Sequence, residues 1–221
     1  MDIQTDRAFV AADKPAVRYC TVTVTAPRPA RAGDPDAQPV PRDVSLVIRD
    51  SMGARTRCLS DFPVEPDVDG MHIELGDLFL TSRDAITLVL ATEICPKAQG
   101  ASTAILLRLG DRDRVLYGAP MDVTWTSVNA DANRIQPVNR EVIMAAAKLL
   151  VERARAEVTE LSRVGAHDRA GKVLDKAIAR IRAMGEGLRD VQGIANRFED
   201  SPSKQSRAAR TSRMRHEVVA S

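Results

Sequence analysis

Short segments of alternating apolar and polar residues fill the N-terminal half of the chain. Residues 19–25 are the clearest case, with Cys20, Val22 and Val24 on one face and threonines on the other. Successive side chains of a strand point to opposite faces, so this pattern predicts a half-buried β-strand. The same reasoning predicts strands at residues 44–48, 58–59, 71–75, 84–92, 103–109, 115–117 and 121–128.

The intervals between these strands carry turn residues. Residues 26–42 contain five prolines, which lack the amide hydrogen that a central strand or helix needs, so a loop is expected there. Residues 60–70 are also expected to be a turn, because they contain Pro63, Pro66 and Gly70. About seven short strands, each with one apolar face to bury, predict an antiparallel β-sandwich over residues 1–135.

The spacing of apolar residues changes near Asn139, from every second residue to every third or fourth. This spacing predicts an amphipathic helix that ends at Gly165, with apolar positions Val142, Ile143, Ala146, Leu149, Leu150, Ala154, Val158 and Leu161. Asn139 is the expected N-cap. Further helices are expected at about 167–184 and 188–198. The fold class is therefore α+β, with a helical hairpin or three-helix region over residues 136–200.

The distribution of charge sets the last segment apart. Residues 201–221 contain five basic residues against Glu217, a net charge of +4, namely Lys204, Arg207, Arg210, Arg213 and Arg215. With few apolar side chains, this segment is predicted to be a disordered basic tail. It supports one alternative function, weak and sequence-independent binding of nucleic acid or an anionic surface. Aromatic residues make up only 3% of the chain, so base-stacking platforms are not expected.

No enzyme chemistry is predicted, and neither catalytic residues nor a cofactor are expected. The three cysteines and three histidines lack the short spacings of metal or redox motifs. Cys58 and His72 flank one loop, but the pattern favours a buried thiol and a surface imidazole over a thiol nucleophile. The odd number of cysteines and the absence of a signal peptide favour a cytoplasmic location, and no segment is apolar enough for a membrane span.

The first predicted helix supplies the candidate contact surface. Its apolar residues Leu149, Leu150 and Val151 span about 200° of the helix, more than one packing interface easily buries. Arg153 and Arg155 follow them, and apolar anchors surrounded by charge are typical of protein–protein contacts. The third helix is an alternative cover for this face. We therefore predict a non-catalytic protein-interaction or scaffold protein, with the partner and the oligomeric state left open.

The residues after the strand at 44–48 resemble part of a metal-binding motif. Arg49-Asp50-Ser51-Met52-Gly53 is similar to the Asp-x-Ser-x-Ser motif, often continued by Met-x-Gly, of bacterial proteins that carry a von Willebrand factor A domain inserted in a β-sandwich. Leu75-Gly76-Asp77-Leu78 resembles the return to the sandwich, and residues 161–167 resemble the family's helical region.

This resemblance implies an insertion point for the A domain near residues 49–56. An A domain needs a long series of alternating strands and helices, and the interval from Gly53 to Met71 is far too short for one. We therefore expect the A domain to be missing. Asp50 and Ser51 alone supply too few oxygen ligands for Mg²⁺, so this remnant motif is predicted not to bind metal.

Overall fold

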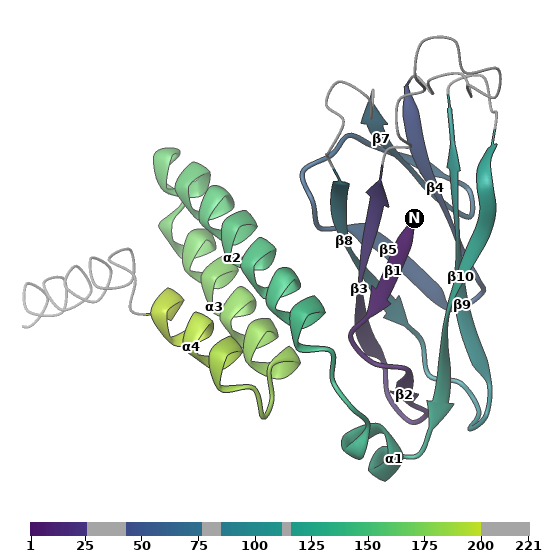
Figure 1. Cartoon of the computed structure of the whole chain (residues 1–221). Coiled ribbons are helices and arrows are strands. Elements are labelled where there is room, and N and C mark those ends of the chain that lie inside the picture. Colours follow the sequence, from purple (N-terminus) through teal and green to yellow (C-terminus); the bar gives the residue numbers. More distant parts are fainter. Residues whose placement is uncertain (26–42, 77–84, 112–115, 200–221) are drawn as a thin grey trace, which may run out of the picture. The chain divides into compact units, whose positions relative to one another are not determined.

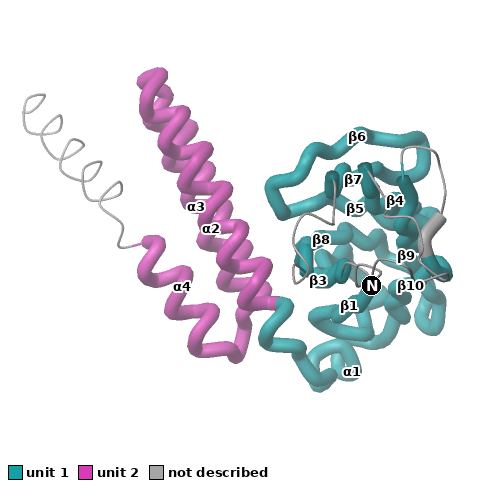
Figure 2. Tube along the Cα trace, turned by 45° about the horizontal axis from the view of Figure 1, so that its top comes forward, with its two compact units in different colours: residues 1–142 teal, residues 143–221 magenta. Residues whose placement is uncertain are grey.

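The computed structural model describes residues 1–25, 43–76, 85–111 and 116–199. The chain divides into two compact units, residues 1–142 and 143–221 (Figure 2). The first is rich in strands and the second is helical, so the predicted α+β class with antiparallel sheets and C-terminal helices is confirmed. The loop expected at 26–42 and the basic tail expected at 201–221 lie outside the described residues.

Two sheets form the first unit (Figure 1). The four-stranded sheet has the order β1 (Asp2–Thr5), β3 (Ala16–Thr25), β8 (Ala85–Ile94) and β5 (Ala54–Cys58). The six-stranded sheet has the order β2 (Phe9–Ala11), β10 (Leu116–Val128), β9 (Ser102–Gly110), β4 (Val44–Asp50), β7 (Gly70–Gly76) and β6 (Val64–Asp67). Neighbouring strands run antiparallel, except that β2 pairs parallel with the end of β10.

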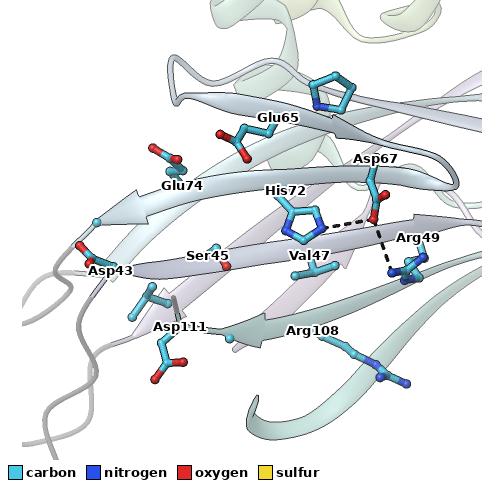
Figure 3. A pocket seen from close by; sticks show the side chains of 14 residues that line it. Asp43, Ser45, Val47, Arg49, Glu65, Asp67, His72, Glu74, Arg108 and Asp111 are labelled. Carbon is cyan, nitrogen blue, oxygen red and sulfur yellow. Dashed lines mark hydrogen bonds and ion pairs between the residues drawn. The ribbon is translucent and has the colours of Figure 1, made fainter. Parts of the chain in front are cut away.

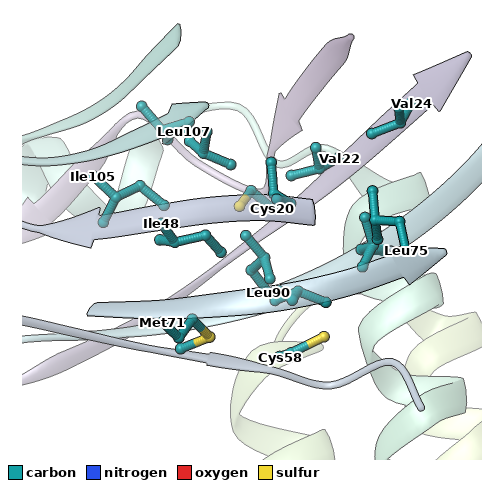
Figure 4. Close-up of a cluster of buried hydrophobic side chains, with 14 of the residues drawn as sticks. Cys20, Val22, Val24, Ile48, Cys58, Met71, Leu75, Leu90, Ile105 and Leu107 are labelled. Carbon is teal, nitrogen blue, oxygen red and sulfur yellow. The ribbon is translucent and has the colours of Figure 1, made fainter. Parts of the chain in front are cut away.

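One aliphatic core lies between the two sheets, and both supply its side chains (Figure 4). On β3 the inward residues are Cys20, Val22 and Val24, as the alternation predicts. They meet inward residues of β4, β5, β7, β8 and β9, among them Ile48, Cys58, Met71, Leu90, Ile105 and Leu107. The alternating pattern therefore identifies the buried face correctly on these strands.

Several strands differ from the prediction. Residues 60–70 are not only a turn, because they contain the edge strand β6, where a proline is tolerated on the unpaired side. Strand β5 begins at Ala54 and ends at Cys58, so the expected strand at 58–59 was placed too late. The two strands expected at 115–117 and 121–128 are one strand, β10, whose register shifts between Tyr117 and Met121.

The turn between β6 and β7 depends on a glycine. A Cβ atom on Gly70 would lie 1.9 Å from the backbone oxygen of Ile48 on the neighbouring strand β4. Two residues earlier, Val68 is almost fully exposed at the tip of the turn. The backbone of β7 therefore approaches β4 more closely than any side chain at position 70 allows.

In the described part of the chain, four helices follow the sheets: α1 (Ala130–Ile135), α2 (Arg140–Arg163), α3 (His167–Met184) and α4 (Arg189–Glu199). Asn139 caps α2 as predicted, since its Oδ1 accepts the N–H groups of Glu141 and Val142 at 3.1 and 3.4 Å. Gly165, with φ of 76°, makes the left-handed turn between α2 and α3. The short helix α1 was not predicted.

Candidate functional site

A shallow hollow lies on the outer face of the six-stranded sheet, away from the core (Figure 3). It is formed by β4, β6, β7 and the end of β9, and its charged and polar lining residues are Asp43, Ser45, Arg49, Glu65, Asp67, His72, Glu74, Arg108 and Asp111. The alternation of β4 and β7 already places Ser45, Arg49 and His72 outward. What the sequence did not show is that these two strands are neighbours, so the hollow was not predicted.

A chain of polar contacts crosses one side of the hollow. The carboxylate of Asp67 lies 3.3 Å from Nε2 of His72 and 3.5 Å from the guanidinium of Arg49 (Figure 3). The Val68 N–H donates to Asp67, and this bond, followed by that of His72, holds the pKa of Asp67 below its usual value. Asp67 is therefore an anion that orients the imidazole.

The lining of the hollow is predominantly acidic. Five carboxylates stand against two arginines and one histidine. Among the lining residues that the structure describes, Ser45 is the only hydroxyl, and no cysteine or lysine is present. Nucleophilic catalysis needs an activated nucleophile next to an oriented base, and the partner of the His72 imidazole in the hollow is the carboxylate of Asp67.

Asp50 and Ser51, the remnant of the metal motif, form hydrogen bonds within the protein. Asp50 Oδ2 accepts the Thr56 N–H at 2.8 Å, and Asp50 Oδ1 accepts the Thr56 hydroxyl. Ser51 exchanges two bonds with Ala104 on β9, one through its N–H and one through its Oγ, each at 3.0 Å. These oxygens therefore hold the β4–β5 turn together. In the described part of the chain, no three Asp, Glu, His or Cys side chains form a metal-ion cluster.

Cys58 and His72 face different environments. Cys58 is buried in the core, where its Sγ donates to the carbonyl of Ser60 at 3.4 Å. His72 lies on the outer face of the other sheet, within the hollow. The arrangement matches the expected buried thiol and surface imidazole, and it does not bring the two side chains into one site.

Among the described residues, the acidic groups with the most strongly raised pKa values lie inside the first unit and not in the hollow. Burial raises the pKa of the Asp6 carboxyl to about 6, although the positive charge of Arg18 opposes the increase. Burial also raises the pKa of the Cys20 thiol to about 12. Asp6 Oδ1 accepts the Tyr19 N–H at 3.1 Å, and the Asp6 carbonyl accepts the Asn139 N–H at 2.8 Å. Asp6 thus joins β3 to the residue that caps α2.

Arg18 fixes the short strand β2 and helix α1 in the same region. Its guanidinium donates to the carbonyl of Phe9 through Nε at 2.9 Å and Nη2 at 2.7 Å, and to Asn133 Oδ1 at 2.7 Å. Gln136 adds a pair of bonds to the Phe9 backbone, at 2.7 and 3.1 Å. Burial lowers the pKa of Arg18. These polar contacts have a structural role, since they satisfy the backbone of β2.

The predicted partner-binding residues of α2 are not equally accessible. Val151 is buried, whereas Leu149 and Leu150 are half-buried and Arg153 is exposed. The guanidinium of Arg155 lies 5.5 Å from the ring centre of Phe198 on α4, a cation–π contact within the helical unit. Of these three apolar residues, Leu149 and Leu150 therefore remain partly accessible.

Two further predictions concern the tail and the membrane. Lys204, Arg207, Arg210, Arg213 and Arg215 lie outside the described residues. Among the helices that the structure describes, none combines the length and the apolar character needed to span a membrane.

Comparison with known proteins gives structural neighbours only. The sequence matches no protein-family model and no curated protein. The chain is similar to a von Willebrand factor type A protein from Catenulispora acidiphila, with a TM-score of 0.41 and 16% identity, over 66% of this chain and 37% of that one. It is also similar to the von Willebrand-type paralog of ArnB from Sulfolobus acidocaldarius, with a TM-score of 0.36 and 10% identity, over 72% and 38% of the two chains.

A third neighbour is the collagen-binding subdomain of an Enterococcus faecalis surface protein, with a TM-score of 0.31 and 10% identity, over 58% of this chain and 95% of that one. The chain spans less than two fifths of the length of each of the first two proteins. Every one of these TM-scores is below 0.5, so they assign the chain to no family. Its structural neighbours thus include bacterial and archaeal von Willebrand factor A-like domains, matched over part of the chain.

Proposed function

We propose that this protein is a non-catalytic interaction or scaffold protein, and that α2 supplies a contact surface for another protein. The observation that carries the proposal is the partial exposure of Leu149 and Leu150, two leucines next to each other on a helix. The exposed Arg153 follows Leu149 by four residues and Leu150 by three, which places it on the same side of the helix as these leucines. Apolar anchors next to an exposed charge are typical of protein-binding surfaces.

The absence of catalysis is part of the same proposal. Active sites usually gather ionisable groups with perturbed pKa values in a cleft. Here Asp6 and Cys20, whose pKa values are raised most, are buried in the strand-rich unit and do not line the hollow. The hollow itself contains an imidazole oriented by Asp67 but no thiol or amine nucleophile among its described lining residues. The free state of all three cysteines supports a reducing, cytoplasmic setting.

The test is affinity capture with the tagged full chain from cells that express it, comparing wild type, Arg153→Glu and Arg169→Glu. Arg169 is exposed on α3 and serves as the matched charge-reversal control. We expect Arg153→Glu to weaken capture of the specific partner about tenfold, a change of about 1.4 kcal/mol in binding free energy. Arg169→Glu should retain the partner, and circular dichroism should show that both variants melt like the wild type.

Arg155 is not used in this test, because its contact with Phe198 connects it to the folding of the helical unit. A further variant that lacks residues 201–221 tests the alternative function. If Arg153→Glu keeps every partner while the deletion loses them all, the basic tail carries the binding and the proposal for α2 is wrong. Loss of nucleic acid alone from the deletion variant would assign the tail a separate, electrostatic function.

A further inference from the structure

Three buried polar side-chain atoms in the sandwich interior have no hydrogen-bond partner among the described residues. They are Thr103 Oγ1, Trp125 Nε1 and Ser127 Oγ. The three residues are almost completely inaccessible, with 1%, 0% and 1% of their surface exposed. Buried polar groups in proteins are nearly always hydrogen-bonded, either to protein atoms or to ordered water.

The register of β9 and β10 brings these three residues together. Thr103 is directly opposite Trp125, so their side chains leave the same face of the sheet. Ser127 is two residues further along β10, and its N–H donates to Ala101 at 2.8 Å. It is therefore the diagonal neighbour of Thr103 on the same inward face. One patch of the six-stranded sheet thus presents two hydroxyls and an indole N–H to the interior.

The opposite sheet presents polar side chains at the same end of the sandwich. Thr92 of β8 pairs with both Arg18 of β3 and Thr56 of β5, so these three residues form one row across the four-stranded sheet. Their side chains lie on the core-facing side of this sheet, which also carries Cys20, Cys58 and Leu90. The Thr92 and Thr56 hydroxyls are 3.1 Å apart. Asp50 of β4 bonds to Thr56, and Arg18 bonds to the carbonyl of Phe9 on β2, so both ends of the row reach the six-stranded sheet.

We propose that this polar layer binds buried water, held by Trp125 Nε1 together with the hydroxyls of Thr103 and Ser127. The indole can only donate and each hydroxyl both donates and accepts, so a water that accepts from Trp125 still has two donors to offer. Buried waters typically make two to four hydrogen bonds to polar groups that the protein leaves unsatisfied. Strictly apolar cavities stay dry, whereas this site offers polar partners.

The layer also explains why polar residues interrupt an otherwise aliphatic core. Thr103, Trp125 and Ser127 continue the inward face that Ile105 and Val123 begin. A bridging water satisfies them without any change in the backbone pairing. The inference does not depend on the proposed function.

The chain contains a single tryptophan, which makes a direct test possible. Rotating-frame water cross-relaxation by NMR, on the full chain, measures contact between long-lived water and the one indole N–H proton. We expect a dipolar cross-peak to water at this proton that persists in Ser127→Ala and in Thr103→Val, because each variant removes only one of the partners. Absence of the cross-peak in the wild type would overturn the proposal.

Thermal unfolding of the same variants gives an independent result. Thr103→Val keeps the side-chain shape and removes the hydroxyl, and Thr124→Val on the exposed face of β10 is the matched control. If water satisfies the hydroxyl, Thr103→Val should lower Tm by about 2–4 °C relative to the control. If the hydroxyl is dry and unsatisfied, its removal raises Tm, and the proposal fails. Ser127→Ala should change Tm in the same direction, which provides a second reading if Thr103→Val does not fold.

Discussion

Replacing Asp6 by asparagine is expected to stabilise the protein at neutral pH. The Asp6 carboxyl is 3% exposed, and burial raises its pKa from the ordinary value of 3.8 to about 6. Folding therefore disfavours the ionised Asp6 carboxyl relative to the protonated one, although Arg18 and the N–H groups of Tyr19 and Arg7 favour the ionised form. Asparagine keeps the shape and an acceptor oxygen for the Tyr19 N–H but carries no charge.

The magnitude follows from the pKa difference. About two pKa units between the folded and the unfolded state correspond to about 3 kcal/mol. Because the pKa of Asp6 is higher in the folded protein, the protonated carboxyl contributes this free energy to the stability of the wild type. The contribution is fully present below about pH 4 and is lost as the pH rises through about 6. The Arg7 N–H also bonds to the carboxylate, and losing that bond costs about 1 kcal/mol. We therefore expect Asp6→Asn to be more stable than wild type by about 2 kcal/mol above pH 7.

The assay is urea unfolding followed by the fluorescence of Trp125, which is fully buried in the same unit. Between about pH 4 and 8, the free energy of unfolding of the wild type should decrease as the pH rises, compared with that of Asp6→Asn. Asp2→Asn, at an exposed position on β1, is the matched control and should follow the wild type. If Asp6→Asn is less stable than the wild type above pH 7 and the difference shrinks as the pH falls, the positive charge of Arg18 outweighs desolvation and the reasoning is refuted.

Two further substitutions test the turns of the first unit. Asp50→Ala should lower the free energy of unfolding by about 1–3 kcal/mol, because the N–H and hydroxyl of Thr56 lose their acceptor. Calorimetric titration of the wild type with Mg²⁺ should show no specific heat of binding. A one-to-one isotherm that Asp50→Ala abolishes would contradict the prediction that Asp50 and Ser51 bind no metal. Gly70→Ala should lower Tm by more than about 4 °C, because the new Cβ atom would meet the backbone oxygen of Ile48. Gly193→Ala in α4 is the control: its Cβ atom would meet nothing within 4 Å, so it should raise the free energy of unfolding by about 0.5–1 kcal/mol. Equal effects of the two substitutions would exclude the backbone clash as the cause.

The local sequence pattern was sufficient to predict those elements whose conformation does not depend on residues distant in the sequence. The alternation on β3 identified Cys20, Val22 and Val24 as core residues, and the change of period identified Asn139 as the cap of α2. Gly165 ends α2 for a reason that acts within a few residues, its left-handed backbone. Such signals depend on interactions close in sequence, so they are visible without knowledge of the fold.

Elements that depend on distant partners were missed. Strand β2 has only three residues and pairs with the end of β10 more than a hundred positions away. Its backbone is satisfied by Arg18 and Gln136, neither of which marks a strand at residues 9–11. The hollow has the same origin, because its residues come from β4, β6, β7 and β9, and alternation gives their outward direction without giving the order of the strands.

The segment at Asp50 shows why a motif must be judged by what its oxygens already bind. A metal site needs carboxylate and hydroxyl oxygens that remain available to the ion. Here both carboxylate oxygens of Asp50 accept bonds from Thr56, and the N–H and Oγ of Ser51 are bonded to Ala104. Since Thr56 belongs to the four-stranded sheet and Asp50 to the six-stranded one, the bond joins the two sheets where the chain crosses between them. Asp50 thus has a structural role in the sandwich, through hydrogen bonds that would have to break before its oxygens could bind an ion.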